Sequence, residues 1–267
     1  MELYNIELFD SHAHYDDEKF NEDRDSVIKA VYESGVTKFI SAGYSLESSK
    51  KAIEIANKYE YIYATCGISP NDIPEGKKSL ETFRKQLIQL EKLAENKKVV
   101  AIGEIGLDYY WNKENKKLQK QVFIEQIDLA NKLNLPIVIH TREAIMDTLD
   151  ILKNVRKTVK PGVFHCCPLN IELVKEAIKL GFYISFAGPV TFKSSKNAES
   201  VIKEVPLDKI LIETDSPYLS PEPNRGTRND SRNVKYIAEK IAIVKQLNIN
   251  EIAKCTYENC KRVFNIK

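Results

Sequence analysis

The sequence predicts an α/β fold, a TIM-type (β/α)8 barrel formed as a single domain over residues 1–267. Three observations predict it: short runs rich in β-branched residues recur along the chain, amphipathic stretches separate them, and the linkers are short without a break in composition. A doubly wound open sheet shares this alternation, but it would carry a glycine-rich phosphate loop after its first strand. Two histidines stand there instead, which favours the closed barrel.

Eight strands are expected in chain order. Each run is short and apolar, and turn-forming or polar residues bound it, as is typical of strands. The expected strands are "IELFD" at 6–10, "TKFISAG" at 37–43, "YIYATCG" at 61–67, "VVAIGEIG" at 99–106, "PIVIHT" at 136–141, "GVFHC" at 162–166, "FYISFAG" at 182–188 and "KILIETD" at 209–215.

Helical periodicity fills the gaps between these strands. Apolar residues recur three and four positions apart, which places them on one face of a helix. Ser45 is a suitable N-cap for one helix, Ser79 stands ahead of the apolar face of a second, and Gly181 suits the position after a third. The helices and their apolar faces are 46–60 (Ala52, Ile55, Ala56, Tyr59), 79–95 (Leu80, Phe83, Leu87, Leu90) and 170–181 (Ile171, Val174, Ile178).

Composition excludes several classes of protein. With 43% hydrophobic and 29% charged residues the chain is not disordered, and a net charge of +2 does not mark a strongly basic nucleic-acid binder, although a local basic site fits. Five cysteines, an odd number, show no paired framework, so a reducing cytoplasm is expected. The N-terminal residues lack a basic region followed by a long apolar core, and no apolar run approaches the ~18 residues of a membrane span. We therefore expect a cytoplasmic protein without a signal peptide or membrane segment.

All four histidines of the chain fall at predicted strand ends, together with two acids. In a parallel barrel these ends share one face, where barrel enzymes carry their chemistry. Residues two apart on a strand point the same way, so the His-x-His pair after the first strand can reach one ion. Imidazole suits Zn, Mn or Fe, and six ligands match two metals that share a carboxylate better than one tetrahedral ion. The set is His12, His14, Glu104, His140, His165 and Asp215.

Longer segments around these residues resemble a known family. The chain resembles the TatD family of metal-dependent deoxyribonucleases, which belongs to the amidohydrolase-type barrels. Related amidohydrolases often have a lysine at the bridging position of strand four, whereas Glu104 stands there in this chain, as in TatD-like proteins. The matching segments, in the family's order, are "FDSHAHYD", "AIGEIGLDYYW", "LPIVIHTREA", "GVFHC", "ISFAGPVTF", "LIETDSPYLSPEPNRGTRN" and "TYENCKRVF".

The resemblance implies an activity and a role for each residue of the set. It implies two divalent metal ions (Zn, Mn or Mg) and hydrolysis of phosphodiester bonds in DNA, with single strands preferred and cleavage from the 3′ end or internally. A metal-activated water would be the nucleophile, with Asp215 as general base and Glu104 as the shared carboxylate. The implied ligands are His12, His14 and Asp215 for the first ion, His140 and His165 for the second, and Glu104 for both.

The chain departs from the family's pattern in two places. The family often has Gly-x-His-Pro after strand three, with a further histidine soon after, where this chain has Ser69 and Asn71. Those family histidines lie near the substrate, so their absence bears on substrate preference rather than on metal binding. After strand six the family often has His-Cys-Phe-Ser-Gly, where this chain has "HCCPL" at 165–169. Cys166 and Cys167 are expected to be small buried residues rather than ligands.

Arginines near the predicted strand ends are candidates for holding a phosphate. Guanidinium groups match phosphate geometry, and Arg142 and Arg225 are the expected contacts. The alternative for the loop after strand eight is that Arg225 and Arg228 brace it by pairing with its own acids. The basic run at 112–120 is expected to be a solvated surface.

Aromatic residues follow the strand-four ligand in "LDYYW" at 107–111. Tyr109 is the expected substrate contact, because nucleobases stack on such rings. Tyr110 and Trp111 are expected to pack against the top of the barrel instead. Asp108 is a candidate for orienting a metal-binding histidine.

Two other functions remain open from the sequence. The same barrel could act on a small phosphoester, lactone or amide, which the near-neutral charge and the Ser69 and Asn71 departures keep open. Such an enzyme would turn over nitrophenyl esters or lactones faster than oligonucleotides. A non-enzymatic metal-binding protein would bind metal without turnover. No obligate protein partner is expected.

Overall fold

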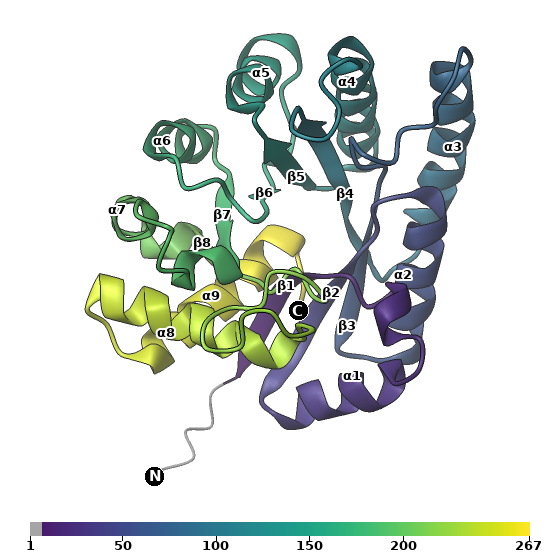
Figure 1. Cartoon of the computed structure of the whole chain (residues 1–267). Coiled ribbons are helices and arrows are strands. Elements are labelled where there is room, and N and C mark those ends of the chain that lie inside the picture. The colour runs from purple at the N-terminus through teal and green to yellow at the C-terminus, as the bar shows by residue number, and fades with distance from the viewer. Residues whose placement is uncertain (1–6) are drawn as a thin grey trace.

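The computed structural model describes residues 7–267, and in it eight parallel strands form one sheet whose spatial order is the chain order (Figure 1). Helices surround the sheet and alternate with its strands, which confirms the predicted TIM-type barrel. The strands are β1 (Leu8–Ala13), β2 (Val36–Ala42), β3 (Ile62–Cys66), β4 (Val99–Asp108), β5 (Ile137–Arg142), β6 (Val163–Phe164), β7 (Tyr183–Phe186) and β8 (Ile210–Ile212).

All eight strands lie where the sequence predicts them, but several of their ends differ. β6 and β8 stop early, so His165 and Asp215 stand beyond their strands rather than on them. The backbone leaves the extended region there, because Cys166 and Asp215 have φ angles of +37° and +57°. β1 instead continues to Ala13 and includes His12. The predicted start of the first strand at residue 6 lies outside the described residues.

The helices confirm the predicted caps in two places and shift them in a third. Ser45 caps its helix by accepting a hydrogen bond from the Ser48 amide, and Gly181 follows its helix with φ +89°. Ser79 is a helical residue whose hydroxyl donates to the Pro74 carbonyl. The helices are α1 (Arg24–Glu33), α2 (Leu46–Lys58), α3 (Ser79–Leu93), α4 (Lys116–Leu133), α5 (Ile145–Asp150), α6 (Ile171–Lys179), α7 (Ala198–Glu204), α8 (Val234–Lys245) and α9 (Ile249–Phe264), with short helices at Glu18–Phe20, Ile151–Val155, Gly188–Thr191, Leu207–Lys209 and Ser231–Asn233.

The predicted apolar faces of these helices are buried only in part. In α2, Ala52, Ile55 and Ala56 are buried as expected. In α3, Phe83 and Leu90 are buried, whereas the other two predicted positions are partly exposed. The buried face of α6 is centred on Leu173, Val174 and Ala177 instead of the flanking isoleucines. No helix within residues 7–267 combines the length and apolarity needed to cross a bilayer.

The interior of the barrel is closed at the N-terminal ends of its strands by α9. Phe9, Val138 and Leu211 come from three strands and form one buried cluster with Cys260 and Phe264 of α9. Because α9 covers the N-terminal ends of the strands, the barrel interior is accessible only at the C-terminal ends, where the predicted polar residues lie. β4 is buried along its whole length on both faces, as expected for a parallel sheet covered by helices.

The barrel closes between β1 and β8 through few backbone contacts. Only an isolated bridge between Ala13 and Ser216 pairs the two ends among the described residues. A buried carboxylate reinforces this seam: Asp10 accepts hydrogen bonds from the amide of Thr214 at 3.0 Å and from its hydroxyl at 2.5 Å. Burial raises the pKa of Asp10 to about 7 despite these hydrogen bonds. The seam therefore fixes the ends of the strands that carry His12 and Asp215.

Candidate metal centre

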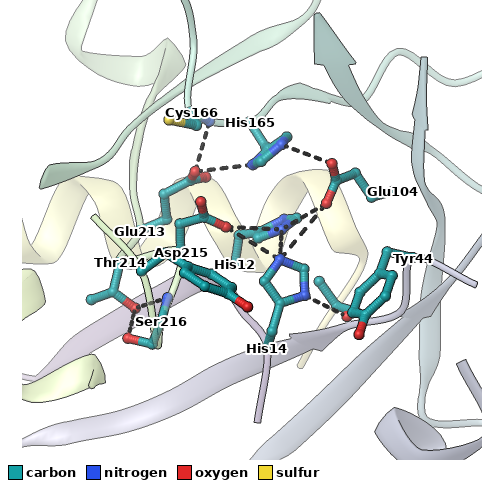
Figure 2. A network of polar contacts seen from close by, with 12 residues as sticks. His12, His14, Tyr44, Glu104, His165, Cys166, Glu213, Thr214, Asp215 and Ser216 are labelled. Carbon is teal, nitrogen blue, oxygen red and sulfur yellow. Dashed lines mark hydrogen bonds and ion pairs between the residues drawn. The ribbon is translucent and has the colours of Figure 1, made fainter. Parts of the chain in front are cut away.

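Six polar side chains converge at the C-terminal ends of the strands. They come from β1, β4 and β5 and from the segments that follow β1, β6 and β8, so they are far apart in sequence and adjacent in space. Figure 2 shows five of them pointing toward one another. These are the residues that the sequence selects: His12, His14, Glu104, His140, His165 and Asp215.

The first group joins the seam of the barrel. His12 Nε2 and His14 Nε2 lie 3.2 Å apart, as their spacing on one strand predicts. Asp215 Oδ1 lies 3.2 Å from His14 Nε2 and 3.7 Å from His12 Nε2. The three ligand atoms lie within 4.8 Å of one another, close enough to surround one cation.

The second group lies across β4, β5 and the end of β6. His140 Nδ1 and His165 Nε2 lie 3.3 Å apart, and Glu104 Oε1 lies 3.0 Å and 3.4 Å from them. The other oxygen, Glu104 Oε2, lies 3.4 Å from His12 Nε2. One carboxylate thus presents an oxygen to each histidine pair, as a ligand shared by two ions would.

The outer ring nitrogens of three histidines contact hydrogen-bond acceptors, so their inner nitrogens are directed at the centre. His14 Nδ1 lies 3.0 Å from the Ala42 carbonyl oxygen, which can only accept. Carboxylates lie beside the outer nitrogens of the other pair, at 2.9 Å from His140 Nε2 and 3.2 Å from His165 Nδ1. Each of these three outer nitrogens therefore carries a proton, and the inner nitrogen of the same ring faces the centre, as in known metal sites. His12 Nδ1 is buried without a partner among residues 7–267. This set of imidazoles and carboxylates fits divalent cations.

Electrostatics keep both carboxylates of the centre ionised. Burial acts to raise the pKa of Glu104, but the charge of His165 and hydrogen bonds from the surrounding histidines hold it well below its usual range. Burial acts likewise on Asp215, and the hydrogen bond and charge of His14 lower its pKa. Burial acts to lower the pKa of His14, but the hydrogen bond with Asp215 and the charge of Asp215 raise it to about 9. A bound cation would replace the inner protons of such histidines.

Asp108 contacts the second group through the outer ring nitrogen of His140. Its side chain is fully buried, and Oδ2 accepts hydrogen bonds from His140 Nε2 at 2.9 Å and Asn71 Nδ2 at 3.2 Å. Oδ1 accepts from the amides of Tyr110 at 2.9 Å and Trp111 at 3.1 Å. Burial acts to raise the pKa of Asp108, but these hydrogen bonds lower it to about 2. The contact of Asp108 with His140 is the orienting contact that the sequence suggests.

Two supporting residues are missed by sequence reasoning. Asn71 lies within a turn held by a hydrogen bond of 2.5 Å from Ser69 to Asp72, and from there its side chain reaches Asp108; no spacing rule indicates this contact. Glu213 is buried, and Oε1 accepts from His165 Nδ1 and from the Cys166 amide at 2.6 Å. Glu213 stands two residues before Asp215, so the same-face spacing that picks out the histidine pair is a signal that could have found it.

A cavity of about 510 Å³ opens above the centre. Its volume is within the usual range for small-molecule sites. Burial and the nearby charge of Asp215 raise the pKa of the Cys166 thiol, so it lines the cavity as a neutral thiol. The cavity is lined by His14, Glu104, His140, Thr141, Arg142, Glu143, His165, Cys166, Pro168, Pro189, Asp215, Tyr218 and Leu219.

The predicted arginines divide between the cavity and the loop. Arg142 lines the cavity. Arg225 is not among the lining residues; its guanidinium lies 4.3 Å from the ring centroid of Phe192. Arg228 pairs with Asp23 at 2.6 Å, and Arg232 pairs with Asp230 at 2.7 Å. Bracing of the loop is thus correct for Arg228, although its partner belongs to a different segment from the one expected.

The aromatic residues are placed the opposite way from the expectation. Tyr109 is buried at 6% exposure, and its hydroxyl donates to Asp147 Oδ2 at 2.6 Å, so the structure does not bring it to the cavity. Tyr110 and Trp111, expected to pack, are 45% and 68% exposed. The cause is that the Tyr109 amide still donates to the Arg142 carbonyl, which extends the β4–β5 pairing by one residue.

A (β/α)8 barrel that gathers two histidine pairs and a carboxylate between them at its C-terminal face has the arrangement expected of a metal-dependent hydrolase. A family model described as TatD related DNase matches residues 9–265. The chain belongs to the TatD family.

Individual relatives agree with this assignment. The metal-dependent hydrolase YabD of Bacillus subtilis is 42% identical over 97% of this chain and 99% of its own length. YcfH of Escherichia coli K12, also described as a metal-dependent hydrolase, is 35% identical over 97% of this chain and 96% of its own length. The crystal structure of YJJV, a TatD homologue from Escherichia coli K12, superposes with a TM-score of 0.88 at 26% identity, covering 98% of this chain and all of that one (100%).

Proposed function

We propose that this TatD-family hydrolase cleaves phosphodiester bonds of DNA, with single strands as the preferred substrate and degradation from the 3′ end. The observation that carries the proposal is Glu104, whose two oxygens face the two histidine pairs at the floor of a cavity lined by Arg142. The description of the matching family as DNases supports it. A cytoplasmic location and action without an obligate protein partner belong to the same proposal.

The residues of the centre would hold two divalent ions, Zn, Mn or Mg. When bound, such ions polarise a phosphoryl oxygen and make a water acidic enough to lose a proton near neutral pH. His12, His14 and Asp215 face one position, and His140 and His165 face the other. Glu104 faces both, and its low pKa keeps it anionic in this role.

Asp215 is the residue we assign as general base. It lines the cavity, its side chain is 16% exposed, and its lowered pKa keeps it ready to accept a proton. Arg142 would hold the phosphate, because no carboxylate in the described part of the chain pairs with its guanidinium and a phosphate matches that group well. Arg225 is assigned as an outer phosphate contact beyond the cavity.

Degradation of labelled DNA tests the proposal. Single-stranded DNA labelled at its 5′ end is incubated with Mg, Mn or Zn, with EDTA, and with the variants His140→Ala and Asp215→Asn. We expect a shortening ladder that EDTA and both variants abolish. Circular dichroism of the variants and of Arg156→Ala, which alters an exposed arginine paired with Asp128, separates loss of activity from loss of fold.

A second candidate is a hydrolase of small esters, since the cavity volume also suits a small molecule. Nitrophenyl phosphoesters and lactones are therefore assayed beside the oligonucleotides. Turnover of these compounds together with intact DNA under every metal would contradict DNA cleavage and support the second candidate. Metal binding without any turnover would contradict both.

A further inference from the structure

Three residues form an exposed surface beside the cavity, and the proposed chemistry uses only Arg142 among them. The Arg142 guanidinium carbon lies 3.8 Å from the ring centroid of Tyr110 and 5.5 Å from that of Trp111. The two rings meet edge to face, with centroids 4.8 Å apart. We call Tyr110, Trp111 and Arg142 the rim platform. Arg142 belongs both to this platform and to the cavity wall, so the two features are continuous.

The backbone of the platform is fixed to the candidate metal centre. Asp108 and Arg142 are paired residues of β4 and β5. Asp108 accepts the amides of both platform rings with one oxygen and His140 Nε2 with the other. A single buried carboxylate therefore sets the position of the platform relative to a ligand of the second ion.

Both rings of the platform are exposed, unlike the ring of Tyr109. The Tyr109 ring is buried, and its hydroxyl is hydrogen bonded. Among residues 7–267, Trp111 is the most exposed aromatic residue, at 68%. Arg142 and the exposed Lys113 add positive charge at the same rim, although Lys113 lies 3.7 Å from Glu143. Exposed aromatic faces with cations beside them are the recurring means of holding unpaired nucleotides.

We propose that the rim platform binds an unpaired nucleobase of the strand whose phosphate lies in the cavity. Trp111 would stack on the base and Tyr110, set at 87° to Trp111, would contact the edge of the base, while Arg142, with one face on Tyr110, keeps its N–H edge for the phosphate. A paired base buries both of its faces in the duplex, so the platform selects single-stranded segments. This inference rests on the proposed function and adds the residues that would hold the base.

Trp111 reports on this binding directly, because it is the only tryptophan of the chain. The whole protein is titrated in EDTA, so that no cleavage occurs, with a short oligothymidylate, an abasic strand of equal length and a blunt duplex. We expect the oligothymidylate to quench the tryptophan fluorescence, and the abasic strand and the duplex to leave it nearly unchanged. Equal quenching by the abasic strand would overturn the proposal, because the contact would then be with the sugar–phosphate backbone.

Two variants measure the contribution of each ring. Tyr110→Leu and Trp111→Leu are compared by anisotropy of a labelled oligothymidylate, and each should bind between about fivefold and 150-fold more weakly. Tyr32→Leu is the matched control, because Tyr32 is also 45% exposed and stacks on Tyr61 with centroids 4.2 Å apart, away from the cavity. Affinity for the abasic strand should be the same in all four proteins. Unchanged oligothymidylate affinity in both platform variants would overturn the proposal.

Failure of the platform and failure of the proposed function give different results. Cleavage of the same strands with Mn and the wild-type chain, without base-dependent quenching, would overturn the platform and leave DNA cleavage standing. Base-dependent quenching without cleavage under any metal would support the platform and overturn the hydrolytic proposal.

Discussion

Replacing Asp108 by asparagine should weaken metal binding at the second position of the centre. The change keeps the shape of the side chain but converts one acceptor oxygen into an N–H₂ donor. His140 Nε2 and Asn71 Nδ2 now donate to one oxygen of Asp108, and the backbone amides of Tyr110 and Trp111 donate to the other. The amide of an asparagine can satisfy only one of these two sides. Either His140 moves its proton to Nδ1, which faces Glu104, or the loop after β4 loses its acceptor.

The structure sets the size of the effect. A charge-assisted hydrogen bond to a fully buried carboxylate is lost, at a cost of about 1.5–3 kcal/mol. At about 1.4 kcal/mol per factor of ten, this corresponds to roughly 10- to 100-fold weaker binding of the second ion, the range found for partners of metal-bound histidines. The first position, formed by His12, His14 and Asp215, should keep its affinity, because none of these residues contacts Asp108.

Calorimetric titration with Mn resolves the two positions. The wild-type chain should bind two ions per molecule, and Asp108→Asn should show one unchanged and one weakened event. Asp128→Asn is the control, since Asp128 is an exposed acid that pairs with Arg156 at 2.9 Å. Wild-type affinity at both positions of Asp108→Asn would refute the orienting role, and equal weakening at both would mean that the substitution damages the whole barrel.

Three further predictions follow from other contacts. Gly106→Ala should destabilise the protein by more than about 2 kcal/mol in urea unfolding, because an added Cβ would lie 2.0 Å from the His140 carbonyl oxygen. Gly76→Ala is the control: Gly76 has φ +89° but no atom nearby, so this variant should show only the smaller cost of backbone strain. Arg142→Ala should raise KM on oligonucleotides and lower the slope of log KM against log salt concentration by about 0.7. Arg156→Ala is the control and should change neither quantity. Arg228 lowers the pKa of Asp23, so their ion pair stabilises the fold above the ordinary pKa of aspartate and loses this effect as the pH falls through the lowered value. The difference in urea midpoint between wild type and Arg228→Ala should therefore shrink in acid. A difference that persists in acid would mean that another contact is responsible.

The clustering of the histidines could be predicted from sequence because two simple rules act on it. Strand ends of a parallel barrel share one face, and residues two apart on a strand point the same way. These rules bring His12 and His14 to one point and place Glu104 between the two pairs. They do not require knowledge of where a strand stops, so the early ends of β6 and β8 do not disturb the result.

The residues around the cluster depend on details that these rules omit. Whether Tyr109 or Tyr110 faces solvent depends on one extra backbone hydrogen bond at the end of β4, and a shift of one residue exchanges buried and exposed rings. Asn71 reaches Asp108 through a turn set by Ser69. Arg228 meets Asp23 across the top of the barrel, from a segment distant in sequence. Each of these contacts joins loops whose relative positions only the folded chain fixes.

The seam between β1 and β8 has a consequence for how the protein opens. Neighbouring strands elsewhere pair through ladders, but these two meet at one isolated bridge, with the Asp10–Thr214 hydrogen bonds beside it. The first position of the centre spans this same seam, because His12 and Asp215 come from its two sides. An ion bound there would link His12 to Asp215 and so close a loop that contains most of the chain. Links that close long loops stabilise a fold most, because they remove the most conformational entropy from the unfolded chain. A bound metal would thus stabilise the barrel against separation of β1 and β8. The stability of the fold would then depend on the same ion as the proposed chemistry.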